Sequence, residues 1–312
     1  MQAGKNQHKI VCRPFTFLAS NGTSLSTLHS RYSLGKMENE NLFLDNFETL
    51  YLFGKGKIVP ENPVMNSYFS MLSSLISNNK EFSLFLVYED FRDKGFRVKR
   101  DADQLLLKRK NSSVSPTQVN VWREDEICTF DDVAGTTGNL IALLDDQGSI
   151  TLFKARKVDP HGEVHSVWPS KIETFNVGAG VCTKESTLPE WFGEKLHGVT
   201  FLGRGEREFL SARNITDDNL EVTRNGRIIA DLLDRGFIVK TGFKYGSSFR
   251  GYEKGLESHA ESLFHDLSAP EEWYKISRAV RVASGVRKRM IFCKVTGNSV
   301  SYVEIRRITD LD

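Results

Sequence analysis

Two stretches of the chain repeat one pattern of apolar and polar positions. Residues 87–99 read VYEDFRDKGFRVK, and residues 229–240 read IADLLDRGFIVK. In each, apolar residues at helical spacing lead to a glycine, Gly95 or Gly236, and a run of strand character follows. A glycine just past the last helical turn commonly ends a helix. Both stretches therefore predict a helix, a glycine cap and a strand.

A second pair of stretches follows the first in the same order. Residues 140–158 read LIALLDDQGSITLFKARKV and residues 290–308 read MIFCKVTGNSVSYVEIRRI, and both predict a strand, a glycine-containing turn and a strand. Matching patterns in matching order predict a duplicated unit. We expect a mixed α/β fold of two tandem repeats. In each, a small N-terminal α/β subdomain precedes a subdomain with a mixed, antiparallel-rich sheet flanked by helices.

The boundaries follow from the positions of these patterns. The stretch DPHGEVHSVWPS has Pro, Gly and His in irregular order, which is typical of a connector. We expect an N-terminal repeat at 1–158 with 83–158 as its second subdomain, a linker at 159–170, and a C-terminal repeat at 171–312 with 226–312 as its second subdomain.

Further helices can be placed from their ends. A helix capped near Asp45 and followed by a strand is predicted within residues 42–58. Residues 63–77 predict a second helix, with Pro63 early in it.

A helix is also predicted within residues 270–290. Ser268 is the candidate cap, and Gly285 is the expected end. The chain then enters an apolar strand, with Lys288 at the junction.

Composition narrows the class of protein. The 312 residues are 39% hydrophobic and 26% charged, which is ordinary for a soluble globular protein. No apolar run reaches the roughly 20 residues that a membrane helix needs, and the first residues lack an apolar signal core. We therefore expect a cytoplasmic protein with no membrane partner. The four cysteines are far apart, which favours buried free thiols over zinc ligands or disulfides.

Charge is uneven along the chain. The net charge is only +2, yet nine Lys or Arg residues lie between Lys275 and Arg307, against one acidic residue, Glu304. Such a local basic field suits a polyanionic partner. A solvated basic face is the equally simple alternative.

The two repeats differ in their reactive side chains. Residues 240–264 contain Tyr252 and His259 in polar surroundings, whereas the corresponding stretch of the first repeat, KRDADQLLLKRKNSSVSPTQVNVW, has neither Tyr nor His. Lys288 likewise has no counterpart near Gly138. This asymmetry predicts a working C-terminal unit and a scaffolding N-terminal unit.

Several motifs in the second half resemble those of the archaeal tRNA-splicing endonucleases. They are GFIVKTGFKYGSSFRGYEKG, then SHAESL, then ISRAVRVASGVRKRM, and ETLYLFGKGKI near the N-terminus is also similar. The resemblance is strong over 231–308 and weaker over 43–158. It implies a tRNA-intron endonuclease of the homodimeric, two-repeat type that cuts precursor tRNA at bulge–helix–bulge structures, with rRNA as a further candidate substrate.

The resemblance carries a catalytic triad onto Tyr252, His259 and Lys288. The loop between Tyr252 and His259 is shorter here than in most relatives. Tyr245 stands where the family usually has Phe, so we expect it to be structural. His265 is the rival histidine, and its place in an apolar strand favours a structural role.

These residue types suit RNA cleavage without a metal or other cofactor. The ribose 2′-hydroxyl serves as nucleophile, and the products are a 2′,3′-cyclic phosphate and a 5′-hydroxyl. A histidine, with an ordinary pKa of about 6.5, can donate a proton to the leaving oxygen. Lys288 can balance the developing negative charge. A phenol, with an ordinary pKa of about 10, is a poor base unless cations such as Lys288 and Arg250 stabilise its anion.

Two alternatives use other chemistry or none. Glu257 and Glu261 flank His259, so a metal-dependent nuclease is one alternative, although such carboxylates are commonly just solvated. A non-catalytic RNA-binding or scaffold member of the same family is the other alternative.

The resemblance also implies RNA and subunit contacts. Arg281 and Arg307 would clamp a flipped-out bulge base, with Arg306 replacing Arg307 if the strand register shifts by one, and phosphate contact by Arg281 is the alternative. Asp145 and Asp146 would form an acidic loop that enters a basic pocket of a second copy. An ordinary hairpin turn is the alternative for that loop.

Overall fold

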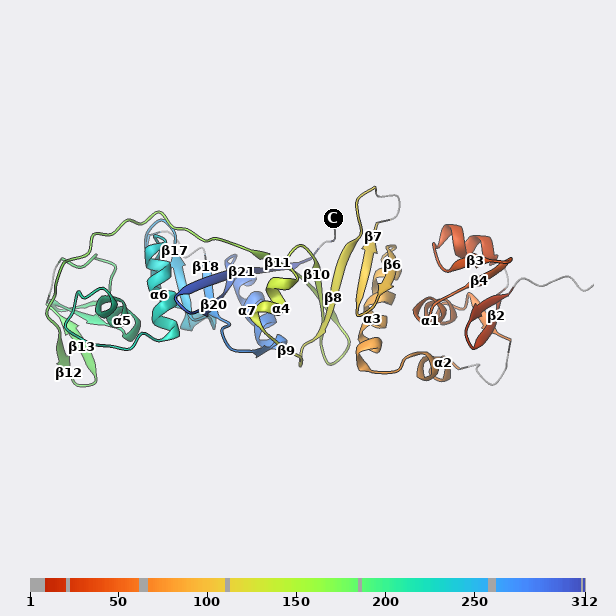
Figure 1. Cartoon of the computed structure of the whole chain (residues 1–312), viewed down its shortest axis with the longest axis horizontal. Coiled ribbons are helices and arrows are strands. Elements are labelled where there is room, and N and C mark those ends of the chain that lie inside the picture. Colours follow the sequence, from red (N-terminus) through yellow and green to blue (C-terminus); the bar gives the residue numbers. More distant parts are fainter. Residues whose placement is uncertain are drawn as a thin grey trace, which may run out of the picture. The chain divides into compact units, whose positions relative to one another are not determined.

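The structure is a computed structural model that describes residues 9–20, 23–61, 67–109, 113–184, 187–257, 262–309 and 311. Internal contacts divide the chain into two units. The first contains Met1–Trp122 and Asp146–Ile150, and the second contains Arg123–Asp145 and Thr151–Asp312. Each unit combines helices with a sheet of mixed strand direction, so the predicted mixed α/β class is confirmed (Figure 1).

The first unit begins with a small sheet of strand order β3-β4-β1-β2-β5. Its elements are β1 (Ile10–Cys12), β2 (Phe15–Ala19), the π-helical turn η1 (Thr27–Arg31), β3 (Lys36–Glu38), β4 (Asn41–Phe43), α1 (Asn46–Gly54), β5 (Ile58–Pro60) and α2 (Tyr68–Leu75). Asp45 caps α1 as predicted, because its side chain accepts from the backbone NH of Glu48 at 2.8 Å. The Glu48 carboxylate in turn accepts from the backbone NH groups of Asp45 at 3.1 Å and Gly35 at 2.9 Å. Pro63 lies outside the described residues.

The first unit continues with a helix and three strands in the order β6-β7-β8. Their bounds are α3 (Asn79–Asp93), β6 (Arg97–Asp101), β7 (Gln104–Lys108) and β8 (Thr117–Arg123). The predicted end of α3 is confirmed, since Gly95 has the left-handed φ of +87° that allows the chain to turn directly into β6.

The second unit contains a larger sheet of order β16-β17-β18-β20-β21-β11-β10. Its strands are β10 (Leu140–Leu144), β11 (Ile150–Lys157), β16 (Ile238–Thr241), β17 (Phe249–Tyr252), β18 (Ser262–Asp266), β20 (Arg289–Thr296) and β21 (Ser299–Ile308). The pairing of β18 with β20 is parallel, whereas β16–β17, β17–β18, β20–β21 and β11–β21 are antiparallel. Both predicted strand–turn–strand segments are confirmed.

Two helices, α6 (Arg224–Asp234) and α7 (Trp273–Gly285), cover opposite faces of this sheet (Figure 1). Ile228 and Leu232 of α6 share a buried cluster with Phe264 and Ile291 of the sheet. The short helix α4 (Phe130–Gly135) also contacts β20 and β21. The middle of the sheet is therefore buried on both faces.

A second small sheet, of order β12-β13-β15-β14, lies elsewhere in the second unit. Its elements are β12 (Phe175–Val177), β13 (Gly180–Thr183), β14 (Glu194–Leu196), β15 (Val199–Leu202) and the helix α5 (Arg204–Ala212). The Glu206 carboxylate accepts from the backbone NH groups of Gly203 at 2.8 Å and Gly193 at 3.0 Å. Glu48 does the same in the first unit, also 13 residues after its glycine partner. This shared arrangement supports the predicted duplication.

The predicted linker crosses the second unit without a helix or strand among residues 159–169. Its backbone bonds to the end of α6, with Gly162 N donating to Arg235 O at 2.9 Å and Val164 N to Gly236 O at 2.9 Å. A Cβ on Gly162 would lie 2.1 Å from the Gly236 carbonyl oxygen, so this close approach requires glycine.

The start of α7 differs from the prediction. Glu271 and Glu272 form a short strand, β19 (Glu271–Glu272), that pairs with β9 (Ile127–Cys128), and the helix begins only at Trp273. Ser268 does not cap it, because its hydroxyl contacts Asp266 and Val295 N instead. The predicted end at Gly285 is confirmed.

The two units do not coincide with the predicted repeats. The physical reason is that β11, from the first repeat, pairs with β21 from the end of the chain, as in the pair Ala155–Ile305. The repeat boundaries therefore stay predictions.

Two expectations from composition can be compared directly with the structure. The four cysteines Cys12, Cys128, Cys182 and Cys293 are buried free thiols, as expected. Within the described part of the chain, no helix is long and apolar enough to cross a membrane.

Candidate active site

The strand register brings two of the predicted catalytic residues into one row of the large sheet. Gly251 of β17 is paired with Ser262 of β18, and Ser262 is paired with Arg289 of β20. Tyr252 and Lys288 each lie one residue beyond that row on the same side, with β18 between them. Neighbouring strands are about 4.8 Å apart, so the backbones of Tyr252 and Lys288 are roughly 10 Å apart.

Alternation along the strands sets which face each residue occupies. Phe264 packs into the cluster on the α6 face, and Ser262, two residues earlier, shares that face. Gly251 belongs to the same row as Ser262, because a Cβ there would meet the Phe264 ring at 2.4 Å. Tyr252 is therefore on the face that α7 covers.

The end of α7 positions Lys288. Arg287 has a left-handed φ of +56°, and the backbone NH of Lys288 bonds back to the carbonyl of Ala283 at 2.8 Å. This closure turns the chain from the helix into β20 within a few residues. It also leaves the lysine beside the negative end of the helix dipole, where a cation is favoured.

Arg250 lies beside Tyr252, as the sequence suggested. Its guanidinium is 5.8 Å from the centroid of the Tyr252 ring, and its Nε donates to the carbonyl of Thr241 at 2.8 Å. The hydrogen bond holds the cation over the ring, and Tyr252 itself is half-buried.

Of the two candidate histidines, only His265 lies within the described residues. His259 lies outside the described residues, so its place in the triad stays a prediction. His265 is half-buried on β18, where its Nε2 is 3.2 Å from a Glu271 carboxylate oxygen. Its ring also packs edge-on against Phe292, with centroids 5.7 Å apart. These contacts agree with a structural role for His265.

The register also separates Arg306 from Arg307. Met290 pairs with Ile305 in the antiparallel β20–β21 ladder, and continuing that register places Arg307 level with Lys288. Arg307 thereby joins the row of Tyr252 and Lys288, whereas Arg306 shares the opposite face with Glu304. Both arginines are exposed, as is Arg281 on α7.

Much of the basic run is not neutralised. Three of its nine cations are in ion pairs: Lys275 with Glu272, Arg289 with Glu253 and Glu304, and Lys294 with Asp131. For the other six, no ion pair is found with any described residue: Arg278, Arg281, Arg287, Lys288, Arg306 and Arg307. These six residues lie on α7, at the junction of α7 with β20 and at the end of β21. Together they give a surface with excess positive charge, called the basic surface below.

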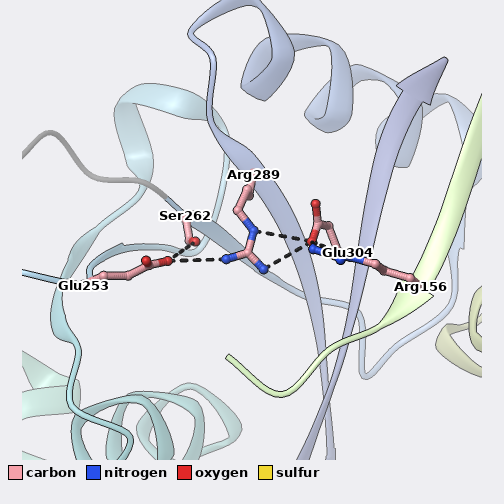
Figure 2. A network of polar contacts seen from close by, with 5 residues as sticks. All are labelled: Arg156, Glu253, Ser262, Arg289 and Glu304. Carbon is pink, nitrogen blue, oxygen red and sulfur yellow. Dashed lines mark hydrogen bonds and ion pairs between the residues drawn. The ribbon is translucent and has the colours of Figure 1, made fainter. Parts of the chain in front are cut away.

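An ionic network lies beneath the candidate site, on the α6 face (Figure 2). Arg289 is its centre, with Nη1 3.4 Å from Glu253 Oε1 and Nη2 3.2 Å from Glu304 Oε2. Arg156 of β11 donates to the same Glu304 oxygen at 2.8 Å, and Ser262 Oγ donates to Glu253 at 3.2 Å.

Sequence reasoning missed this network. Two signals were present: Glu253 and Arg289 directly follow Tyr252 and Lys288, and Glu304 is the single acid of the basic run. Neither signal shows which face a residue occupies, and that depends on the register.

The predicted acidic loop is the turn between β10 and β11. Asp145 is half-buried and Asp146 is exposed, and Gly148 has the positive φ of +80° that the turn needs.

A cavity of about 690 Å³ lies between the linker and α6 and is lined among others by His161, Trp168 and Arg235. None of its lining residues belongs to the row of Tyr252 and Lys288. No group of three or more potential metal ligands occurs among the described residues.

Comparison with known proteins shows which family the sequence is related to. Residues 223–302 match the family model described as tRNA intron endonuclease, catalytic C-terminal domain. The chain is 33% identical to the tRNA-splicing endonuclease of Thermoplasma volcanium, over 96% of this chain and 98% of that protein. It is 31% identical to that of Picrophilus torridus, over 95% and 96%, and 25% identical to that of Methanococcoides burtonii, over 88% and 92%.

Proposed function

Since this chain belongs to the tRNA-splicing endonuclease family, we propose that it is an endoribonuclease that excises introns from precursor tRNA at bulge–helix–bulge structures. We further propose that it works by acid–base catalysis without a metal ion. The observation that carries the mechanism is the row in which Tyr252 and Lys288 lie on either side of β18, the strand that leads out of the His259 segment.

In this mechanism the RNA supplies its own nucleophile. Tyr252 takes the proton from the ribose 2′-hydroxyl, whose oxygen then attacks the adjacent phosphorus. His259 gives a proton to the departing 5′-oxygen, and Lys288 balances the negative charge that gathers on the phosphoryl oxygens. The bond to the 5′-oxygen breaks as the new oxygen–phosphorus bond forms. The products are a 2′,3′-cyclic phosphate and a 5′-hydroxyl end.

The spacing of the candidate residues suits this division of labour. The base, Tyr252, and the cation, Lys288, must both reach one phosphodiester. Their backbones, roughly 10 Å apart, leave room for it between the two side chains. The Arg250 guanidinium over the Tyr252 ring adds positive charge where a phenolate would have to form.

Substrate recognition would rest on the shape of the RNA and on its unpaired bases, because side chains cannot read the deep major groove of an RNA helix. Arg307, in the row of Lys288, and Arg281, on α7, are the proposed contacts to a flipped-out bulge base. Phosphate contact is the second possibility for each, and the unpaired basic surface favours either.

We propose that the protein acts as a homodimer. The loop with Asp145 and Asp146 supplies acidic groups, and the basic surface supplies excess positive charge. Insertion of this loop into the basic surface of a second copy would neutralise charge on both sides.

Cleavage of a bulge–helix–bulge RNA in excess EDTA tests the enzymatic proposal. Native protein should cut at both bulges and leave cyclic phosphate ends, and His259→Ala, Lys288→Ala and Tyr252→Phe should each slow cleavage by about 100- to 10,000-fold. Tyr245→Phe is the matched control for Tyr252→Phe, since Tyr245 lies in the turn η3 (Phe243–Tyr245) and has no catalytic role in this proposal. An rRNA fragment with the same secondary structure extends the test to the second candidate substrate.

Three other outcomes would each point elsewhere. No cleavage by native protein, with intact RNA binding, would favour a scaffold member of the family. Activity that EDTA abolishes would favour a metal-dependent nuclease. Full activity of His259→Ala would assign the acid to another group.

A further inference from the structure

Two of the proposed catalytic residues are each followed in the chain by a charged residue. Glu253 follows Tyr252, and Arg289 follows Lys288. These two neighbours form an ion pair with each other, with Nη1 of Arg289 3.4 Å from Oε1 of Glu253 (Figure 2). The contact therefore joins the chain positions adjacent to the proposed base and the proposed cation.

The same glutamate holds the strand that lies between them. Ser262 is fully buried, and its Oγ donates to Oε1 of Glu253 at 3.2 Å. Ser262 is also the first described residue after the segment that contains His259. One carboxylate oxygen thus contacts groups from both β18 and β20, at the end where Tyr252 and Lys288 lie.

On its other side Arg289 is fixed by Glu304 of β21. Nε and Nη2 of Arg289 lie 3.3 Å and 3.2 Å from Oε2 of Glu304, a side chain that is only 10% exposed. Arg156 of β11 donates to the same oxygen at 3.1 Å and 2.8 Å. The contacts therefore extend across the sheet from the end of β17 to β11. They lie on the α6 face, opposite the face that carries Tyr252, Lys288 and Arg307.

Stability alone gives little reason for charges at this place. The network borders the apolar cluster on the α6 face, which includes Phe264 and Ile291. Apolar residues in such a position often stabilise a fold as well as a partly buried ion pair does. A guanidinium that contacts two carboxylates fixes direction and distance as well as charge, because its planar fork has set donor angles.

We propose that Glu253 and Arg289 are positioning residues, which set the lateral spacing of Tyr252 and Lys288 from the opposite face of the sheet. This inference rests on the proposed function. Neither residue contacts the RNA in this proposal, and both act through the strand ends that they join. A misplacement of about 1 Å in such a constellation costs on the order of 100-fold in rate.

Single-turnover cleavage at saturating enzyme tests the proposal, with Glu253→Gln and Arg289→Lys as variants. Arg289→Lys keeps the positive charge but lacks the fork that reaches both carboxylates. We expect the rate constant to fall by about 100-fold in both. The dissociation constant for an RNA that lacks the 2′-hydroxyl at the cleavage site should not change. Lys294→Gln, which removes a surface ion pair at the far end of the same strand, is the control and should leave the rate unchanged.

A double variant shows whether the two residues act as one unit. If they do, Glu253→Gln with Arg289→Lys loses no more rate than the worse single variant. Urea unfolding and circular dichroism establish that each variant is folded at the assay temperature. If the charge variants do not fold, Ser262→Ala carries the test, since it removes only one donor to Glu253 and should still lower the rate without weakening binding.

Folded variants that keep the native rate at saturation would overturn the proposal. Weaker RNA binding with an unchanged rate would overturn it as well, and would assign a direct RNA contact instead. Failure of the proposed function is a separate result, because native protein would then not cleave. If native protein cleaves, Lys288→Ala does not, and Glu253→Gln keeps the full rate, only the positioning role is refuted.

Discussion

Arg307 lies level with Lys288 across the β20–β21 ladder, whereas its neighbour Arg306 shares the opposite face with Glu304. Of these two arginines, Arg307 is therefore the one on the face of Tyr252 and Lys288, where we propose that RNA binds. We expect Arg307→Ala to weaken binding of a bulge-containing RNA by about 5- to 100-fold, and Arg306→Ala to have a much smaller effect. Fluorescence anisotropy with an RNA that cannot be cut measures both.

The salt dependence of that binding distinguishes the two kinds of contact. If Arg307 contacts a phosphate, Arg307→Ala lowers the slope of log Kd against log salt by about one. If it stacks on a base, the slope is unchanged. Equal losses for Arg306→Ala and Arg307→Ala would contradict the assignment of faces.

The acidic turn between β10 and β11 gives a prediction about assembly. Asp145→Lys with Asp146→Lys replaces two acids by two bases, so the turn should be repelled by a basic pocket on a second copy. We expect this variant to be monomeric by light scattering and to lose cleavage activity. Asp101→Lys with Asp103→Lys makes the same change at the exposed β6–β7 turn and serves as the control. A variant of Asp145 and Asp146 that stays dimeric would exclude this turn as the contact.

Glu206 gives a prediction about stability. Its carboxylate accepts from two backbone NH groups, those of Gly193 and Gly203, at 3.0 Å and 2.8 Å. Glu206→Ala leaves both donors without this partner and should cost about 1–3 kcal/mol in the free energy of unfolding. Glu190→Ala, at an exposed position nearby in the chain, should cost far less. Urea unfolding of both variants makes the comparison, and equal midpoints would show that the cap contributes nothing.

The buried thiols predict how stability changes with pH. Burial raises the pKa of Cys128 to about 12 from an ordinary value of 9.0. A raised pKa in the folded state favours the protonated thiol, so the contribution is complete below pH 9 and is lost as the pH rises towards 12. The loss from this one group is at most about 1.4 kcal/mol per pH unit.

Urea midpoints between pH 7.5 and pH 10.5, roughly the range that spans the ordinary thiol pKa, should therefore fall less steeply in Cys128→Ala than in the native chain. The absolute midpoints will differ for packing reasons, so only the slopes are compared. Parallel slopes would show that Cys128 ionises in the folded state. A thiol reagent such as Ellman's should also react with the four cysteines only after unfolding.

Local signals in the sequence predicted many element ends correctly. Asp45 caps α1, Gly95 and Gly236 end α3 and α6, and Gly285 ends α7. Caps and glycine turns depend on a few neighbouring residues, which is why the sequence suffices for them.

Contacts from distant parts of the chain decided the cases that sequence reasoning missed. The backbone NH groups of Trp273 and Tyr274 bond to the carbonyls of Glu126 and Glu124, which draws the preceding glutamates into β19 and delays the helix. The row of Tyr252 and Lys288 likewise depends on the parallel register of β18 with β20, which no local pattern specifies. The small sheet before α5 was foreseeable in part, because Gly193 and Glu206 repeat the spacing of Gly35 and Glu48.

The pairing of β11 with β21 has a consequence for synthesis of the chain on the ribosome. β21 begins 142 residues after β11 ends, yet its place is between β20 and β11, in the interior of the sheet. At 5–20 residues per second, β11 waits roughly 7–30 s for its partner. During that interval its unpaired backbone groups form an open edge that other nascent chains can join. The sheet that carries Tyr252 and Lys288 is therefore complete only after β21 has been made, and a chain truncated before β21 is expected to be prone to aggregation.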